Sequence, residues 1–187
     1  MRKLLLAGLA LAFATPASAS LAPGATAPDF QLEGALAGKP FSMKLSAALK
    51  KGPVVLYFFP AAFTPGCNAE AHAFAEAADA FKAAGATVIG VTAGNVEKIT
   101  EFSADTATCS GKFPIAAAKP DVITGYDVAL SFPSKDGSPP KPITSRTSYV
   151  IAPDGKVLFV HSDMSPADHV KTTLKAVQDY QAAHKHA

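Results

Sequence analysis

The stretch Pro53-Val-Val-Leu-Tyr-Phe-Phe-Pro-Ala-Ala-Phe-Thr-Pro-Gly-Cys67 carries most of the information about the fold of this chain. Its apolar, β-rich run over 54–59 predicts a central strand covered on both faces of a sheet. A short loop then delivers a lone cysteine to an Ala- and Phe-rich stretch over 68–84 with helical character. Unpaired N–H groups and the helix dipole stabilise an anion at a helix start, so this position favours a thiolate at Cys67.

The remaining elements follow in an order that describes a single mixed sheet. Strands over 54–59 and 86–91, joined by a helix over 68–84 that ends at Gly85, form a βαβ unit with a parallel crossover. The other expected elements are a hairpin from 29–32 and 40–43, a helical turn over 46–51 capped by Ser46, a helix over 95–104 capped by Asn95, a short helix over 120–126, an exposed loop over 132–142, a hairpin from 147–152 and 156–161, and a final helix over 165–183. This order predicts an α/β fold, a thioredoxin-like mixed sheet with helices on both faces.

The first 19 residues have the pattern of a cleavable secretory signal. Arg2 and Lys3 give a basic start, residues 4–14 an apolar centre, and Pro16-Ala-Ser-Ala19 a small-residue end, so cleavage is expected after Ala19. The apolar centre is too short to span a bilayer, although a membrane anchor or a buried first helix are the alternatives. We therefore expect a signal peptide over 1–19, one thioredoxin-like domain over 20–187, and a periplasmic or secreted protein.

The charge balance argues against two classes of partner. The chain has 17 basic and 15 acidic residues, and loss of Arg2 and Lys3 with the signal leaves 15 of each. A neutral domain has no electrostatic footprint for nucleic acid or for an anionic membrane, so we expect neither as a partner. The sequence leaves open whether the protein is a monomer or a weak homodimer.

The chain resembles the peroxiredoxins. Residues 60–67, Pro60-Ala-Ala-Phe-Thr64-Pro-Gly-Cys67, fill every fixed position of that family's active-site pattern Pro-x-x-x-Thr-x-x-Cys. The segments Ala27-Pro-Asp-Phe30 and Arg146-Thr-Ser-Tyr-Val-Ile151 look like the family's opening segment and its arginine-bearing strand. Thr-Pro-Gly-Cys with Glu70-Ala71 is similar to the Q-type, or bacterioferritin comigratory protein, branch. The resemblance covers about residues 22–180.

The resemblance implies a thiol peroxidase that reduces hydrogen peroxide and small organic hydroperoxides. Cys67 would attack a peroxide oxygen as the thiolate, with Thr64 holding sulfur and peroxide. Arg146 would stabilise the thiolate and orient the peroxide, and Pro60 would shield the pocket. Glu70 would orient Arg146. The alternatives are an inert disulfide for Cys67, a helix cap for Thr64 and a surface charge for Arg146.

The fate of the oxidised sulfur depends on Cys109. A sulfenic acid at Cys67 condenses readily with a second thiol. Many Q-type proteins place that thiol five residues after the first, where this chain has His72. Cys109 is the only other cysteine, so it is the expected resolving residue, the alternatives being a permanent structural bridge or an idle thiol. A thioredoxin-like dithiol reductant would then recycle the disulfide.

Two other functions fit the sequence less well than a peroxidase does. A disulfide oxidoreductase would want a Cys-x-x-Cys motif, which the sequence lacks. A copper-handling thioredoxin-like protein would want two nearby thiols and a well-placed histidine. On a helix, Cys67 and His72 would point about 140° apart, which is poor aim for one ion. We therefore expect no metal and no cofactor.

Overall fold

The computed structural model describes residues 20–133, 137, 139–140 and 143–184. The expected signal peptide over 1–19 lies outside the described residues, as does part of the expected loop over 132–142. Within the described part, no helix has both the length and the apolar character needed to cross a membrane.

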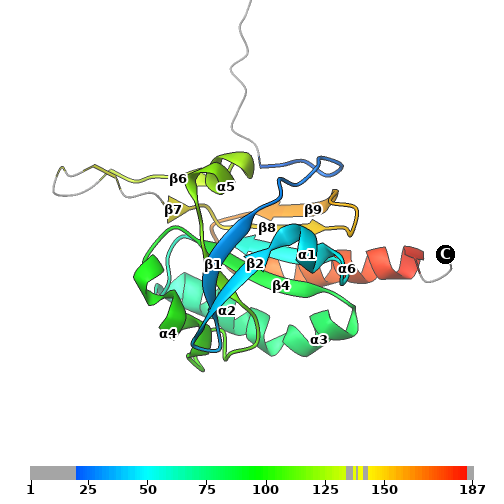
Figure 1. Ribbon diagram of the computed structural model, residues 1–187, viewed down its shortest axis with the longest axis horizontal. Helices are drawn as coiled ribbons and strands as arrows, with labels where there is room; N and C mark the ends of the chain where they lie inside the picture. Colours follow the sequence, from blue (N-terminus) through cyan, green and yellow to red (C-terminus); the bar gives the residue numbers. More distant parts are fainter. Residues whose placement is uncertain (1–19, 134–136, 138, 141–142, 185–187) are drawn as a thin grey trace, which may run out of the picture.

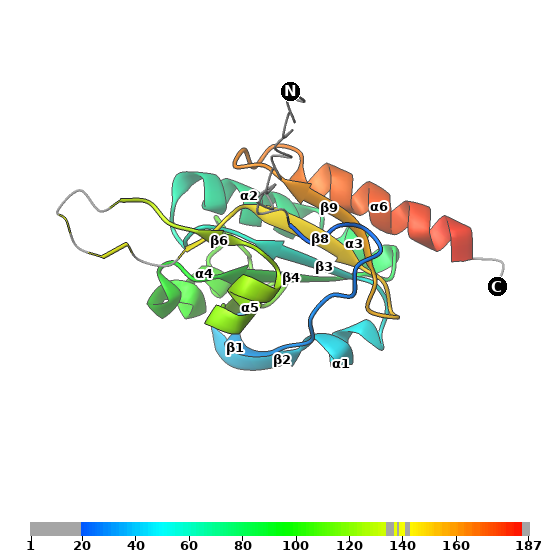
Figure 2. The ribbon, with the colours of Figure 1, turned by 90° about the horizontal axis from the view of Figure 1, so that it is seen from above.

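Seven strands form one mixed sheet in the order β2-β1-β5-β4-β3-β8-β9. In Figure 2 this order runs from β2 and β1 at the lower edge to β9 at the upper edge. The strands of the sheet are β1 (Gln31–Leu36), β2 (Lys39–Lys44), β3 (Val54–Phe58), β4 (Thr87–Thr92), β5 (Ile115–Ala117), β8 (Thr147–Ile151) and β9 (Val157–Ser162). A separate two-stranded sheet pairs β6 (Ala129–Leu130) with β7 (Ile143–Thr144).

The expected central strand is confirmed. All five residues of β3 are buried, and the strand pairs in parallel with β4 and antiparallel with β8. The parallel pair requires the helical crossover between residues 58 and 87, while the antiparallel pair brings the start of β8 beside the end of β3. Thr147, the first residue of β8, is in register with Phe58. The chain therefore places residues near 146 at the edge where the cysteine loop begins.

Helices cover both faces of the sheet, as the predicted fold class requires. Figure 1 shows α2, α3 and α4 below the sheet and α5 above it. The helices are α1 (Leu45–Leu49), α2 (Pro65–Glu76), α3 (Ala78–Ala83), the 3-10 turn η1 (Val96–Lys98), α4 (Ile99–Ala104), α5 (Pro120–Gly125) and α6 (His169–His184). Gly85 follows α3 with a φ of +72°, a left-handed conformation that ends a helix readily in glycine.

Two apolar clusters form the core, one on each face of the sheet. The cluster on the side of α1 and α5 contains Leu56 and Phe58 of β3. The cluster on the side of α2, α3, α4 and α6 contains Tyr57 and the two cysteines. In this second cluster the ring of Tyr57 stacks on Phe74 with 4.4 Å between centroids, which anchors α2 to the central strand.

Several expected element boundaries are wrong, and the reasons are local. The first hairpin turns through Ala37 and Gly38, both with positive φ, so its strands are longer than expected. Helix α2 begins at Pro65, three residues before the expected helical stretch. The expected single helix is interrupted at Ala77, which separates α2 from α3. The final helix begins at His169 instead of 165, after a segment of bends.

Neither expected cap is observed. Asn95 has a left-handed backbone, and its side-chain amide donates to the carbonyl of Ala62 instead of capping η1. Helix α1 begins at Leu45, so Ser46 lies inside it, and the backbone N–H of Ser46 donates to Oδ1 of Asp29 at 2.8 Å. The carboxylate of Asp29 therefore serves the helix start that the hydroxyl of Ser46 was expected to serve.

Replacing Asp29 should weaken the attachment of α1 to the chain before β1. We expect Asp29→Ala to lower the free energy of unfolding by about 1 kcal/mol, the usual cost of losing a helix cap, measured by urea denaturation. Lys44→Ala is the control, because it removes only the exposed Lys44–Asp29 ion pair of 3.9 Å and should cost less than about 0.5 kcal/mol. Equal losses in the two variants would contradict the capping role.

Candidate active site

The start of α2 holds Cys67 beneath a short strained loop. Thr64 precedes the helix in an extended conformation, Pro65 is its first residue, and Cys67 lies in its first turn with a side chain that is almost fully buried. Proline suits this place because its missing N–H would have no helical partner. Phe63 has a φ of +59°, a left-handed conformation that is uncommon outside glycine. The neighbouring structure must therefore hold the loop in place.

The connection after β4 supplies that support. The side-chain amide of Asn95 donates to the carbonyl of Ala62 at 2.8 Å, and the N–H of Ala62 donates to the carbonyl of Gly94. A Cβ on Gly94 would lie 2.3 Å from the carbonyl oxygen of Pro60, so only glycine allows this close approach. Inside the loop, the hydroxyl of Thr64 donates to the carbonyl of Ala61 at 3.0 Å. These contacts fix the path of the chain between β3 and α2.

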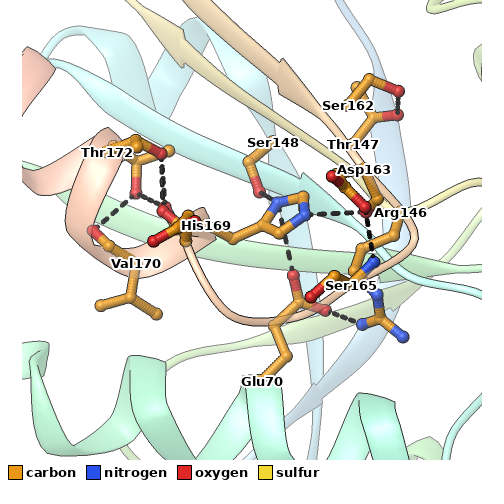
Figure 3. Close-up of polar contacts among 12 residues, drawn as sticks. Glu70, Arg146, Thr147, Ser148, Ser162, Asp163, Ser165, His169, Val170 and Thr172 are labelled. Atoms are coloured by element: carbon orange, nitrogen blue, oxygen red, sulfur yellow. Dashed lines mark hydrogen bonds and ion pairs between the residues drawn. The ribbon is translucent and has the colours of Figure 1, made fainter.

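The guanidinium of Arg146 joins three segments at this point. Its Nη2 donates to Sγ of Cys67 at 3.5 Å, its Nη1 donates to Oε2 of Glu70, and its Nε donates to the carbonyl of Met164 at 2.9 Å. Figure 3 shows Arg146 reaching from the start of β8 toward the carboxylate of Glu70. Cys67 and Glu70 are three residues apart on α2 and share one face, so one planar cation contacts both.

Burial and charge act together on this ion pair. The side chains of Glu70 and Arg146 are 0% and 5% exposed. Burial raises the pKa of the Glu70 carboxyl to about 7, although the attraction of Arg146 acts in the opposite direction. Burial alone would lower the pKa of Arg146, but the neighbouring Glu70 and Cys67 raise it above its ordinary value. The guanidinium is therefore a permanent cation beside a buried sulfur.

His169 forms a second layer behind the ion pair. Its Nδ1 lies 2.8 Å from Oγ of Ser148 and 3.6 Å from Oε1 of Glu70, and its Nε2 lies 2.9 Å from the carbonyl oxygen of Asp163. Figure 3 shows the imidazole between the carboxylate and the loop after β9. Burial lowers the pKa of His169 to about 4, so the ring is neutral at neutral pH.

Cys109 lies in the same apolar cluster as Cys67 but in another segment. It is fully buried in the turns after α4, and both thiols are free in this structure. Burial raises the pKa of the Cys109 thiol well above its ordinary value, although the hydroxyl of Thr108 lowers it slightly. Cys109 is therefore a neutral thiol in this conformation.

The structure brings together most, but not all, of the residues that the sequence singled out. Arg146 reaches Cys67, so it is not a surface charge, and Glu70 contacts Arg146 as expected. The hydroxyl of Thr64 bonds inside its own loop and makes no side-chain cap on α2. Pro60 lies two residues after the end of β3, at the start of the same loop, and its carbonyl accepts from the hydroxyl of Thr92.

Sequence reasoning missed the histidine and the backbone carbonyl that complete the site. In the sequence, nothing in the neighbourhood of His169 marks it as buried. The carbonyl of Met164 carries no sequence signature at all. His72, in contrast, is exposed and lies 3.7 Å from Glu76 in an ordinary helix-surface pair. Among the described residues, no group of three or more His, Cys, Asp or Glu side chains could hold a metal ion.

Comparison with known proteins gives a consistent family. The model of the AhpC/TSA family matches residues 23–160. A putative peroxiredoxin of Mycobacterium tuberculosis is 34% identical over 160 residues, covering 83% of this chain and 97% of that protein. The chloroplastic peroxiredoxin Q of Sedum lineare is 31% identical over 164 residues, covering 86% of this chain and 80% of that protein.

Solved structures agree with these relatives. The crystal structure of peroxidoxin BcpB from Mycobacterium tuberculosis superimposes with a TM-score of 0.70 at 31% identity, covering 84% of this chain and 96% of that one. Peroxiredoxin Q of Xanthomonas campestris, at 24% identity, has the same fold with a TM-score of 0.65 and covers 80% of this chain and 91% of that one.

The approach of Gly66 to Arg146 gives a test of the site geometry. A Cβ on Gly66 would lie 3.1 Å from Nη2 of Arg146, so Gly66→Ala should displace the guanidinium by a few tenths of an ångström from Cys67. We expect the rate of Cys67 alkylation by iodoacetamide at neutral pH to fall severalfold, followed by peptide mass spectrometry. Ala69→Ser, an exposed change on the same helix, is the control and should keep the parent rate. Equal rates in all three proteins would contradict the contact.

Proposed function

The chain belongs to the AhpC/TSA family and is a peroxiredoxin, and from this premise we propose that it reduces peroxides through the thiolate of Cys67. The observation that carries the assignment of the nucleophile is the 3.5 Å contact between Sγ of Cys67 and Nη2 of Arg146 at the start of α2. A helix start and a buried guanidinium both stabilise a negative sulfur. The proposed substrates are hydrogen peroxide and small organic hydroperoxides.

The first step transfers one oxygen atom to sulfur. The thiolate of Cys67 attacks the terminal oxygen of a hydroperoxide, the O–O bond breaks, and the electron pair leaves with the alkoxide or hydroxide, which then takes up a proton. Cys67 becomes a sulfenic acid. The step needs a positioned sulfur and donors aimed at the oxygen on which charge develops.

The proposed roles of the other residues follow from their contacts. Arg146 holds the sulfur and offers N–H donors to the peroxide. The hydroxyl of Thr64 already donates to Ala61, so toward a peroxide it presents an acceptor for the O–H of the substrate. Pro60 has no N–H and cannot prolong the strand ladder, and its proposed role is to shield the pocket.

Cys109 is the proposed resolving residue. Its thiol condenses with the sulfenic acid of Cys67, forming an S–S bond and releasing water. Both cysteines are buried and belong to different segments, so we propose that the segment around Cys109 moves when the bond forms. A thioredoxin-like dithiol then reduces the disulfide by exchange and restores both thiols.

We also propose three properties of the whole protein. The pattern over 1–19 supports a cleaved signal peptide and a periplasmic or secreted location. The near-neutral mature chain supports the absence of nucleic-acid and membrane partners. The large apolar side chains that are exposed in the described part, such as Phe132 and Met164, come from separate segments, which is compatible with a monomer or a weak homodimer.

The non-peroxidase alternatives are not favoured. The chain matches the AhpC/TSA family, and the named relatives are peroxiredoxins. A copper-handling protein would require a histidine beside the thiols. His72 is exposed on α2 and is paired with Glu76.

Pre-steady-state peroxide reduction tests the role of Cys67 and Arg146. We expect one equivalent of peroxide to oxidise the reduced protein rapidly, Cys67→Ser to abolish the reaction, and Arg146→Lys to slow it about 100-fold, because an ammonium group cannot hold both Cys67 and Glu70. The measurement is stopped-flow peroxide consumption. Lys156→Met is the control and should react like the parent, because Lys156 is an exposed cation whose ammonium group donates to the hydroxyl of Thr26. A fully active Cys67→Ser protein would overturn the assignment.

The role of Cys109 is tested by separating the first oxidation from turnover. We expect Cys109→Ser to consume the first equivalent of peroxide at the parent rate but to form no intramolecular disulfide and to lose multiple turnover with a thioredoxin-like reductant. Non-reducing mass spectrometry detects the disulfide directly. If a thioredoxin-like reductant still sustained turnover in Cys109→Ser at the parent rate, the resolving role would be wrong.

The export proposal is tested by processing of the whole chain. When the full sequence is expressed in a bacterium with a secretory pathway, we expect the mature protein to begin at Ser20 and to be recovered outside the cytoplasm. N-terminal sequencing and cell fractionation measure this. A variant with Ala17 and Ala19 both changed to Phe is the control and should remain uncleaved, and an intact N-terminus in the parent would contradict the proposal.

A further inference from the structure

Behind Arg146, a carboxylate oxygen is buried in an unusual state. Glu70 uses Oε2 to bind Arg146, but its other oxygen, Oε1, is buried and has no hydrogen-bond partner in the described structure. The polar atom that faces it is Nδ1 of His169 at 3.6 Å. An ionised carboxylate oxygen left without a donor inside a protein is costly, so the protonation of this pair needs an explanation.

The hydrogen bonds of His169 determine which ring nitrogen carries its proton. The carbonyl of Asp163, 2.9 Å from Nε2, can only accept, so Nε2 carries the hydrogen. In the neutral ring Nδ1 is then a lone pair, which accepts from the hydroxyl of Ser148 at 2.8 Å. A lone pair on Nδ1 and an ionised Oε1 of Glu70 would repel each other. One proton on this pair removes that repulsion and the unpaired negative charge on Oε1. The hydroxyl of Ser148 can donate or accept, so it can turn to accept when Nδ1 takes the proton.

We propose that Glu70 and His169 hold one proton between them. Because this proton neutralises the carboxylate of Glu70, the positive charge of Arg146 stabilises the thiolate of Cys67 alone. The proposal rests on the proposed role of Cys67 as the nucleophile and deepens it. His169 is thus a positioning residue, because it touches Glu70 and not the reacting atoms. Figure 3 shows this order of contacts, from the imidazole to the carboxylate and from the carboxylate to the guanidinium.

Charge counting explains why the proton matters. Arg146 supplies one positive charge, whereas an ionised Glu70 and an ionised Cys67 supply two negative charges, all in a buried site. The two anions compete for one guanidinium, and their excess charge is expensive away from water. With one proton on the Glu70–His169 pair, the site is neutral when Cys67 is a thiolate. Ionisation of the sulfur and protonation of the pair are therefore coupled.

The direction of each pKa shift is consistent with a shared proton. Burial raises the pKa of Glu70 to about 7, against the attraction of Arg146, and lowers the pKa of His169 to about 4. Relative to the unfolded chain, the contribution of Glu70 to stability is present below about pH 4.5 and is lost as the pH rises through 7. The contribution of His169 is present above about pH 6.5 and is lost as the pH falls through 4. The two dependences oppose each other.

Three other charged or titratable residues surround the pair, and none of them contacts Oε1 of Glu70 as His169 does. From β9, the ring of His161 contacts the ring of His169 edge-on, with 4.5 Å between centroids. From the loop after β9, Asp163 contributes its carbonyl to Nε2, and its carboxylate acts on His169 only through space. From β3, the buried hydroxyl of Tyr57 stays neutral, because burial holds its pKa well above the ordinary value.

The test is a double-mutant cycle on His169 and Glu70 in the Cys109→Ser background, where Cys67 is the single thiol. His169→Gln keeps a donor near Nε2 for the carbonyl of Asp163 but removes Nδ1. We expect both iodoacetamide alkylation and peroxide consumption to slow about tenfold near pH 6 and to return to the parent rate near pH 9, because the thiolate then forms at higher pH. In the Glu70→Gln background the same change at His169 should have no effect.

The cycle separates an electrostatic role of His169 from a structural one. His72→Gln, which removes an exposed imidazole on α2, is the matched control and should keep the parent pH profile. An equal effect of His169→Gln in both backgrounds, or an unchanged pH profile in the first, would overturn the proposal. If Cys67 is alkylated but consumes no peroxide, the proposed function fails instead, so the two failures are distinguishable.

A second measurement does not depend on the folding of the His169 variant. In the reduced parent protein and in Cys67→Ser, carbon-13 NMR of the carboxyl carbon of Glu70 reports the titration of the pair. In Cys67→Ser, Glu70 is the only anion that contacts Arg146, because the competing thiolate is absent. We therefore expect the Glu70–His169 pair to lose its proton at lower pH in Cys67→Ser than in the parent. Identical titration curves in the two proteins would also overturn the proposal.

Discussion

The arrangement of the site depends on a single buried guanidinium that is shared by two acids. Each nitrogen of Arg146 has a different partner, and the three partners come from the start of α2 and from the loop after β9. Removing any one of these contacts would leave a buried charge without full compensation, which costs far more than the loss of an exposed ion pair. The cation therefore ties the helix start, the strand start and the loop into one unit.

The topology explains why the guanidinium can reach the sulfur. Because β3 and β8 pair antiparallel, the end of β3 and the start of β8 lie at the same edge of the sheet. Cys67 follows β3 by one loop, and Arg146 immediately precedes β8. Cys67 and Arg146 are 79 positions apart in the sequence, and one pair of neighbouring strands brings them together. A βαβ crossover alone would not achieve this, because it leaves the next strand running parallel.

Sequence reasoning succeeded where a local pattern has one structural solution. A continuous apolar run gave β3, and glycine after an amphipathic stretch gave the end of α3. It failed where a tertiary contact competes with a local one. Asp29 arrives from another segment to serve α1, and Asn95 turns away from its own helix toward Ala62. The proximity of Cys67 to Arg146 came only from the family resemblance, since spacing alone does not bring residues 67 and 146 together.

His169 illustrates the limit most clearly. A histidine followed by Val, Lys and Thr looks like an ordinary helix start, and its burial is decided by bends between β9 and α6 that no periodicity announces. The sequence does not indicate the burial of Glu70 either, because a glutamate three residues after a cysteine is compatible with an exposed helix surface. The fold brings His169 and Glu70 together in a buried site between β8, β9 and α2, and only there do they interact.

The two cysteines are held by contacts of different range, and this difference decides which of them can move. Cys67 is tied to the fold through Arg146 and Glu70, which are far apart in the chain. Cys109 lies in turns that are held mostly from within, by the hydroxyl of Thr108 bonded to the carbonyls of Phe102 and Asp105. Opening this segment breaks mostly local hydrogen bonds, although it also removes Cys109 from the apolar cluster that it shares with Cys67. In the proposed mechanism, the contacts of Arg146 with Cys67 and Glu70 can therefore stay in place while Cys109 approaches, because none of them involves the segment around Cys109.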